Sequence, residues 1–197
     1  MTEPVNGVVL PPSPPGRLTL GPAVARFDRA ADVALERIRD HRLTDAVFIG
    51  ASTLGDFSVI WHISGIVRGL TSDRRATQAY LLAGLLGAES LVVNQGLKRI
   101  FRRQRPTVEG DPRFHVRRPL TSSFPSGHAS AAAFAATMLT GWDGRRAAPL
   151  WWSMAVTVAA SRAYVRIHHA SDVVAGMATG GVLALVARRL LRRTGMT

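Results

Sequence analysis

Residues 76–101 read ATQAYLLAGLLGAESLVVNQGLKRIF, a long apolar stretch that ends in positive charge. About 20 mainly apolar residues are enough for a helix to cross a bilayer. Lys98, near the end of the stretch, is the only lysine among 25 basic residues, and the other 24 are arginines. An ammonium group is a compact point charge, whereas a guanidinium group is a planar fork. The stretch therefore predicts a membrane-spanning helix whose last turn carries an unusual cation.

The rest of the chain repeats this alternation of apolar segments and charged ends. Four further apolar segments cover residues 44–70, 126–140, 149–165 and 173–191. The second of them is short for a span and rich in Ala and Ser, and the last contains Gly176 and Gly180, a spacing that allows close helix packing. The sequence shows no strand-type alternation. We predict an all-α integral membrane helical bundle with about five spans.

The N-terminal region has a different character. Residues 1–22 contain the helix-breaking run Pro11-Pro12-Ser13-Pro14-Pro15-Gly16 and lack the pattern of a signal peptide, so we expect a mobile tail. Residues 23–40 carry apolar side chains at helical spacing, at Val24, Phe27, Ala31, Leu35 and Ile38. This pattern predicts an amphipathic helix on the membrane interface, or alternatively a surface helix on a soluble core. We expect residues 23–197 to form a single membrane-embedded domain.

The amino-acid composition indicates which kinds of molecule the protein binds. The 197-residue chain has a net charge of +12 and no cysteine, which excludes disulfides and cysteine-bound metals. A strongly basic balance favours anionic partners such as nucleic acid, anionic lipid or phosphate esters. The mean hydropathy is only slightly positive, because the charges cluster between apolar segments.

The order of the polar motifs predicts where they meet. Lys98 to Arg105 ends one span and His128 begins the next, while Arg162 ends the following span and His168 begins the last. Successive spans cross the bilayer in alternating directions. These four groups should therefore lie on the same side of the membrane, although they are spread over about 70 positions of sequence.

Three ordered motifs support a family resemblance. They read Lys98-x6-Arg105-Pro106, then Pro125-Ser126-Gly127-His128, then Ser161-Arg162-x5-His168-x3-Asp172. This pattern resembles the type 2 phosphatidic acid phosphatase family of membrane lipid phosphatases, to which soluble acid phosphatases and vanadium haloperoxidases are related. The resemblance covers roughly residues 76–191.

The resemblance implies a role for each motif residue. His168 would be a nucleophile that forms a phosphohistidine, Asp172 would orient its ring, and His128 would be the general acid. The phosphate-binding residues that it implies are Lys98, Arg105, Ser126, Gly127 and Arg162. Because side-chain cations would neutralise the phosphoryl oxygens, we expect neither a metal nor another cofactor.

Two positions depart from the family pattern. The family often has Gly two residues before the nucleophile and an aromatic residue after it, whereas this chain has Arg166 and His169. Arg166 could add a phosphate contact, and His169 could compete with His168, because both histidines share a helix face with Asp172.

Other charged residues have simpler interpretations. Arg99, Arg102 and Arg103 are expected to lie near lipid headgroups. Asp56, His62 and Glu89 lie within apolar segments, where we expect structural hydrogen bonds inside the bundle, or as a second choice a polar cavity near the site.

The predicted function is that of a metal-independent lipid phosphate or diphosphate phosphatase. Its substrate would be a polyprenyl (di)phosphate, phosphatidic acid or phosphatidylglycerol phosphate, with membrane lipids as partners and no nucleic acid. The alternatives are a vanadate-dependent haloperoxidase and a non-catalytic protein that binds anionic lipid. Arginines opposite the site, including Arg74 and Arg145, mark the cytoplasmic side by the positive-inside rule. The active site would then lie on the outer, extracytoplasmic face of the bacterial cell membrane.

Overall fold

The structure is a computed structural model that describes residues 20–107, 111–117 and 121–195 of the chain. Its elements are α1 (Gly21–Glu36), α2 (Arg42–Gly55), η1 (Asp56–Ser58), α3 (Val59–Gly69), α4 (Asp73–Ser90), η2 (Leu91–Leu97, a π-helical turn), α5 (Lys98–Ile100), α6 (Gly127–Asp143), η3 (Arg145–Ala147), α7 (Ala148–Tyr164) and α8 (Ala170–Arg193). No strand occurs in these ranges. The predicted all-α membrane bundle is confirmed, whereas most of the predicted tail, residues 1–19, lies outside the described residues.

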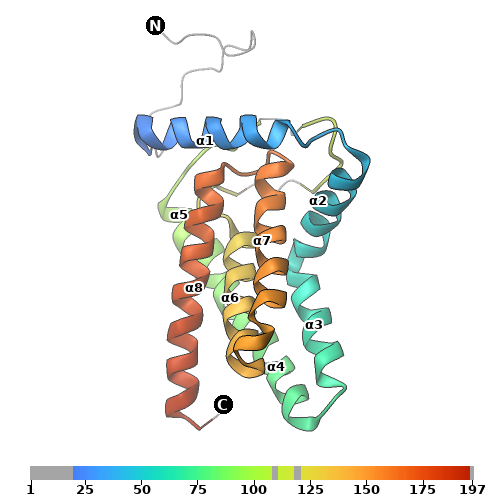
Figure 1. Ribbon diagram of the computed structural model, residues 1–197. Helices are drawn as coiled ribbons and strands as arrows, with labels where there is room; N and C mark the ends of the chain where they lie inside the picture. Colours follow the sequence, from blue (N-terminus) through green and yellow to red (C-terminus); the bar gives the residue numbers. More distant parts are fainter. Residues whose placement is uncertain (1–19, 108–110, 118–120, 196–197) are drawn as a thin grey trace, which may run out of the picture.

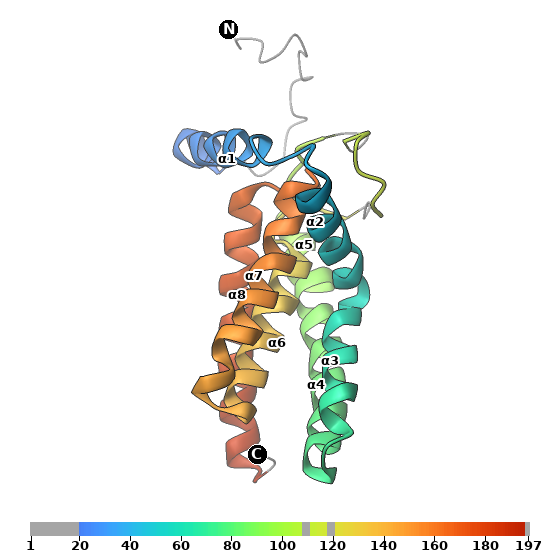
Figure 2. The same cartoon turned by 45° about the vertical axis from the view of Figure 1, so that its right-hand side comes forward.

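Helix α6 is the centre of the bundle, and it packs against α7, α8 and α4 (Figures 1 and 2). Its Ala-rich sequence is almost wholly buried, because small side chains let the neighbouring helices approach closely. A methyl group added at Gly176 or Gly180 of α8 would lie only 2.4 Å or 1.9 Å from a backbone carbonyl oxygen of the α6 segment. The predicted close packing at these two glycines is therefore confirmed.

Among the described residues, three helical segments are long and apolar enough to cross a membrane: Arg42–Gly69, which is kinked at Phe57, Asp73–Ile100 and Ala170–Arg193. Helices α6 and α7 have 17 residues each, which at about 1.5 Å per residue falls short of a hydrocarbon core of about 30 Å. Both nevertheless lie inside the bundle beside the long helices (Figure 1). The count of about five spans stays a prediction.

Helix α1 lies across the end of the bundle, over the ends of α7 and α8 (Figures 1 and 2). The face that α1 turns toward the bundle is not purely apolar. Phe27 and Ile38 are exposed, whereas Asp28 and the nearby Arg39 are buried. The inner face of this helix is thus partly ionic, because its carboxylates meet arginines of the loops below.

Candidate functional site

The predicted site residues meet at one end of the bundle, beneath α1. This end contains the last turns of α5 and α7 and the first turns of α6 and α8. The backbone N–H of Ser126 donates to the carbonyl of Asp172 at 3.0 Å, which ties the starts of α6 and α8 together. The predicted convergence of the motifs on one side of the bundle is confirmed.

His168 lies in the short loop between α7 and α8 and is 2% exposed. Its Nε2 is 3.2 Å from an Nη of Arg105, which also donates to the carbonyl of Ile167 at 2.8 Å. Arginine is a donor only, so Nε2 must be the unprotonated nitrogen and Nδ1 must carry the proton. Burial lowers the pKa of His168 well below its ordinary value, and the ring is neutral at physiological pH. The lone pair of Nε2 therefore faces the cationic side of the site.

Asp172 receives donors from several directions. Its carboxylate accepts hydrogen bonds from the Ser123 hydroxyl and, at 2.9 Å, from the backbone N–H of His169, and it lies 3.7 Å from Nδ1 of His168. His169 instead begins α8, with its ring 4.0 Å from Asp28. The geometry places His168, and not His169, beside Arg105.

Arg103 also pairs with Asp172. The sequence-based interpretation of Arg103 as an interfacial charge is therefore wrong. The sequence offered no signal for this contact, because the resemblance specifies no residue at this position.

Two further cations of the motifs, Arg162 and Lys98, are buried at this end of the bundle. Arg162 is 1% exposed, and one Nη donates to the carbonyl and the hydroxyl of Ser52. Its Nε and other Nη are buried and have no hydrogen-bond partner within the described part of the chain. Lys98 is also buried, with Nζ 3.5 Å from the Thr121 hydroxyl. Buried donors of this kind are costly unless an anion occupies the space before them.

The start of α6 forms the remaining wall. Ser126 is the N-cap, and its hydroxyl accepts from the N–H of Ala129 at 3.4 Å. Gly127 follows at the first helical position, where a methyl group would lie 3.2 Å from Asn94 and 3.6 Å from Nζ of Lys98. A helix N-terminus packed this closely against a lysine suits an anion.

His128 is paired with a carboxylate from the first long helical segment. Its Nε2 lies 2.8 Å from the carboxylate of Asp56, which is also 4.0 Å from Arg162. Asp56 thus lies at the site, which agrees with the second interpretation, a polar group near the site, and not with a purely structural hydrogen bond. Glu89, by contrast, accepts a hydrogen bond from Ser130 inside the bundle, as predicted.

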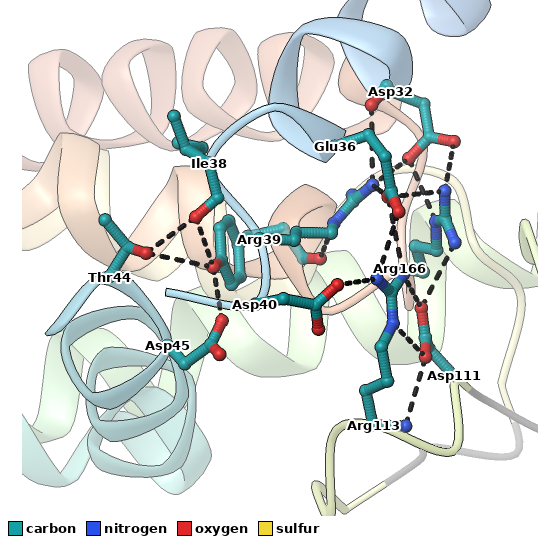
Figure 3. A network of polar contacts seen from close by, with 11 residues as sticks. Asp32, Glu36, Ile38, Arg39, Asp40, Thr44, Asp45, Asp111, Arg113 and Arg166 are labelled. Carbon is teal, nitrogen blue, oxygen red and sulfur yellow. Dashed lines mark hydrogen bonds and ion pairs between the residues drawn. The ribbon is translucent and has the colours of Figure 1, made fainter. Parts of the chain in front are cut away.

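Arg166 lies apart from the cluster of Lys98, Arg105 and Arg162 and pairs with carboxylates instead. Its guanidinium contacts the carboxylates of Asp32, Glu36 and Asp111 at 3.0–3.2 Å (Figure 3). The hypothesis of a phosphate contact is therefore wrong for this arrangement. Its backbone has a φ of 55°, in the left-handed region that favours glycine, which explains physically why the family often has Gly here.

Arg113 completes this ionic cluster (Figure 3). Hydrogen bonds from Arg113 lower the pKa of Glu36 and of Asp111 to about 2 in each case. We call Asp32, Glu36, Asp111, Arg113 and Arg166 the ionic latch, because they join α1 to the loops around the site.

Residues 78–195 match the PAP2 superfamily. The chain belongs to this superfamily. Decaprenylphosphoryl-5-phosphoribose phosphatase of Mycobacterium tuberculosis, in strains CDC 1551 and H37Rv, is 30% identical over 137 residues, which are 70% of this chain and 75% of the relative. The crystal structure of a transmembrane PAP2-type phosphatidylglycerolphosphate phosphatase from Bacillus subtilis superposes with a TM-score of 0.65 and 24% identity, covering 88% of this chain and 89% of that one.

Membership confirms the predicted family and enzyme class: this PAP2 protein is a hydrolase of phosphate esters in a membrane-embedded helical fold. The PAP2 match does not cover all the residues that line the site. The three motifs lie inside the PAP2 match, whereas Asp28, Ser52 and Asp56 come from α1, α2 and η1, before the match begins. The N-terminal helices therefore add contacts that the PAP2 motifs do not encode.

Proposed function

We propose that this PAP2 protein hydrolyses a lipid phosphate or diphosphate through a phosphohistidine at His168. One observation carries the proposal: the acceptor nitrogen of His168 faces Arg105, while buried donors of Arg162 have no partner in the described residues. A phosphoryl group between them would accept those donors and present phosphorus to the Nε2 lone pair. Such donors stabilise the charge that redistributes over the phosphoryl oxygens in the transition state.

In the first step, Nε2 of His168 attacks phosphorus and the bond from phosphorus to the lipid oxygen breaks. Protonated His128 donates a proton to that oxygen, so the lipid leaves as an alcohol or as a phosphate. Asp172, 3.7 Å from Nδ1, stabilises the positive charge that the ring of His168 gains. Lys98, Arg105 and Arg162, together with Ser126 and the Gly127 amide, hold the phosphoryl oxygens.

In the second step, neutral His128 takes a proton from a water molecule as that water attacks the phosphohistidine. The bond between phosphorus and Nε2 breaks and its electron pair returns to His168, which releases inorganic phosphate. Asp56 supports both steps because its carboxylate stabilises the protonated form of His128. In this scheme the cationic side chains, and no metal, neutralise the phosphoryl charge.

For the substrate, we propose a polyprenyl-linked phosphate. The mycobacterial relative named as a decaprenylphosphoryl-5-phosphoribose phosphatase covers most of both chains and favours this class over phosphatidic acid or phosphatidylglycerol phosphate. The Bacillus structure supports the fold alone. We further propose that residues 23–197 work as a single membrane-embedded phosphatase domain.

We also propose that the site faces the extracytoplasmic side. Arg74, Arg75, Arg145 and Arg146 are exposed at the opposite end of the bundle, as the positive-inside rule requires for a cytoplasmic face. Arg68 does not contribute to this argument, because it is buried and paired with Asp143 at 2.7 Å.

The test is phosphate release by the protein purified in detergent with EDTA, over a panel of a decaprenyl-linked phosphosugar, a polyprenyl diphosphate, phosphatidic acid and phosphatidylglycerol phosphate. We expect the polyprenyl substrates to turn over fastest, His168→Asn to be inactive, and an acid-labile, base-stable phosphoprotein to accumulate on rapid quenching. Full activity of His168→Asn, or a strict requirement for a divalent ion, would overturn the mechanism. Halide oxidation with vanadate would instead support the haloperoxidase alternative, and lipid binding without any turnover the non-catalytic one.

A further inference from the structure

We infer that Asp28 of α1 is a positioning residue, which acts through Arg103 to hold Asp172 and thereby His168. The inference rests on the proposed function, since it concerns the alignment of the proposed nucleophile. It assigns a role in turnover to a helix that precedes the PAP2 match.

Asp28 is a buried carboxylate that accepts three hydrogen bonds. It accepts hydrogen bonds from the backbone N–H and the hydroxyl of Ser171, both at 2.8 Å, and from an Nη of Arg103 at 2.7 Å. Only 8% of the residue is exposed, although it lies on a helix at the end of the bundle. A carboxylate is buried in this way only when its partners compensate for the lost hydration. Asp28 therefore docks α1 onto the first turn of α8, next to Asp172.

Arg103 connects this carboxylate to the proposed catalytic one. One Nη of its guanidinium donates to Asp28, and the other donates to Asp172 and to the Ser171 hydroxyl. The side chain is largely buried, so it has few other partners to choose from. A single planar group thus bridges α1 and the aspartate that faces the ring of His168.

The bridge limits how Arg103 can bind Asp172. Arginine prefers to grip a carboxylate with two parallel N–H groups. Because Asp28 holds the second nitrogen, Arg103 reaches only one oxygen of Asp172, and the other oxygen stays with Ser123, His169 and the ring of His168. Without Asp28, Arg103 can turn both nitrogens toward Asp172 and draw its carboxylate away from His168. Asp28 would therefore affect the chemical step more than substrate binding.

The test compares Asp28→Asn with Asp32→Asn in the same helix. Asp32 also docks α1, through Arg166 and Arg39, but has no contact with Arg103 or Asp172 among the described residues. We expect Asp28→Asn to lower kcat roughly tenfold and to leave KM unchanged. A loss of this size is typical when a residue that orients a catalytic group is replaced. Asp32→Asn should keep kcat within about twofold of wild type. Thermal unfolding of both variants reports the shared loss of docking.

A double-mutant cycle with Arg103→Gln tests whether Asp28 acts through Arg103. If Asp28 acts through Arg103, Asp28→Asn should cause no further loss of kcat in the Arg103→Gln protein. Additive losses, a rise in KM at constant kcat, or equal effects of Asp28→Asn and Asp32→Asn would overturn the inference. Should Asp28→Asn unfold, Arg103→Lys replaces it. Lysine has one terminal nitrogen and cannot reproduce the two separate Nη contacts of Arg103, so we expect the same loss of kcat.

Wild type and His168→Asn are measured in parallel on the same substrate. Full activity of His168→Asn would mean that the proposed function has failed. An inactive His168→Asn together with a fully active Asp28→Asn would leave the proposed function standing and refute the role of Asp28 alone.

Discussion

Nε2 of His128 lies 2.8 Å from the carboxylate of Asp56, a residue 72 positions away in the sequence. Asp56 is placed there by a break in the first long helical segment, where Phe57 and Ser58 both have positive φ angles, 52° and 60°. Residues with side chains avoid this left-handed region, so the break is a strained feature at the edge of the site. Its effect is to turn a carboxylate toward the proposed general acid.

This pairing predicts that Asp56→Asn impairs protonation of the leaving group. We expect a loss of kcat of about tenfold with a lipid alcohol as leaving group, because the variant no longer stabilises the protonated imidazole. With a nitrophenyl phosphate, whose leaving group needs no proton, the loss should be small. The comparison of kcat for the two substrates measures this effect. Asp143→Asn, which breaks an ion pair at the opposite end of the bundle, is the control and should affect both substrates equally.

Gly55, just before the break, lies close to the ring of His128, and a substitution there tests how tightly α2 packs against this ring. A methyl group at Gly55 would lie 2.8 Å from a ring carbon of His128 and 2.9 Å from Val158. Gly55→Ala should therefore displace the ring, reduce kcat, and destabilise the fold by about 1–3 kcal/mol through overpacking. Gly84→Ala is the matched control, because the space around Gly84 is open and a helical alanine should leave stability equal or higher. Thermal unfolding and kcat of the two variants decide between these outcomes, and wild-type kcat in Gly55→Ala would contradict the packing argument.

The helices and the motif residues could be predicted from the sequence because both depend on local patterns. Apolar length gave the long segments, and the alternation of spans was enough to bring Lys98, His128 and His168 to one end of the bundle. Small residues at 3.6-residue spacing also predicted the tight contact at Gly176 and Gly180. None of these inferences needed the conformation of a single side chain.

The contacts that sequence reasoning missed are those between charges far apart in the chain. The sequence indicated an interfacial arginine at Arg103 and an internal hydrogen-bonding group at Asp56. The residues next to a charged side chain in the sequence do not identify an ion-pair partner that lies far away in the chain. In α1, likewise, the apolar spacing gave no sign that Asp28 would be buried in an ion pair with Arg103.

Replacing Lys98, the single lysine, with arginine changes the shape of the cationic group but keeps its charge. Nζ of Lys98 is buried against Thr121 and the start of α6, where a methyl group on Gly127 would be 3.6 Å away. A guanidinium is larger and planar, so Lys98→Arg should crowd the phosphate space and reduce kcat/KM by roughly tenfold or more. Arg99→Lys, at an exposed position bonded to Gln95, is the control and should change kcat/KM little. Wild-type kcat/KM in Lys98→Arg would mean that the site accepts any cation here.

The ionic latch predicts how stability responds to acid. Arg113 lowers the pKa of Glu36 and Asp111 to about 2, below the ordinary values near 4. A lowered carboxyl pKa contributes stability above the unfolded pKa, and that contribution is lost as the pH falls from about 4 to about 2. Arg113→Gln should lower the melting temperature at pH 7 by about 2–4 °C, a modest effect because Glu36 is partly exposed to solvent. The difference from wild type should shrink toward pH 2, which thermal unfolding between pH 7 and pH 2 measures; a constant difference would place the effect elsewhere than in these carboxylates.

Arg166 combines a strained backbone with three carboxylate partners, and two substitutions separate these effects. Arg166→Ala removes the contacts to Asp32, Glu36 and Asp111 but keeps a side chain at a φ of 55°, whereas Arg166→Gly removes the contacts and also relieves the strain. The left-handed conformation costs about 1–2 kcal/mol for a residue with a Cβ. We therefore expect both variants to be less stable than wild type, and Arg166→Gly to be more stable than Arg166→Ala by about 1 kcal/mol, measured by thermal unfolding in detergent. Because residue 166 lies outside the proposed phosphate-binding residues and precedes His168 by two positions, kcat should follow the same order as stability, with KM unchanged. A rise in KM in both variants would instead show that the Arg166 guanidinium reaches the substrate.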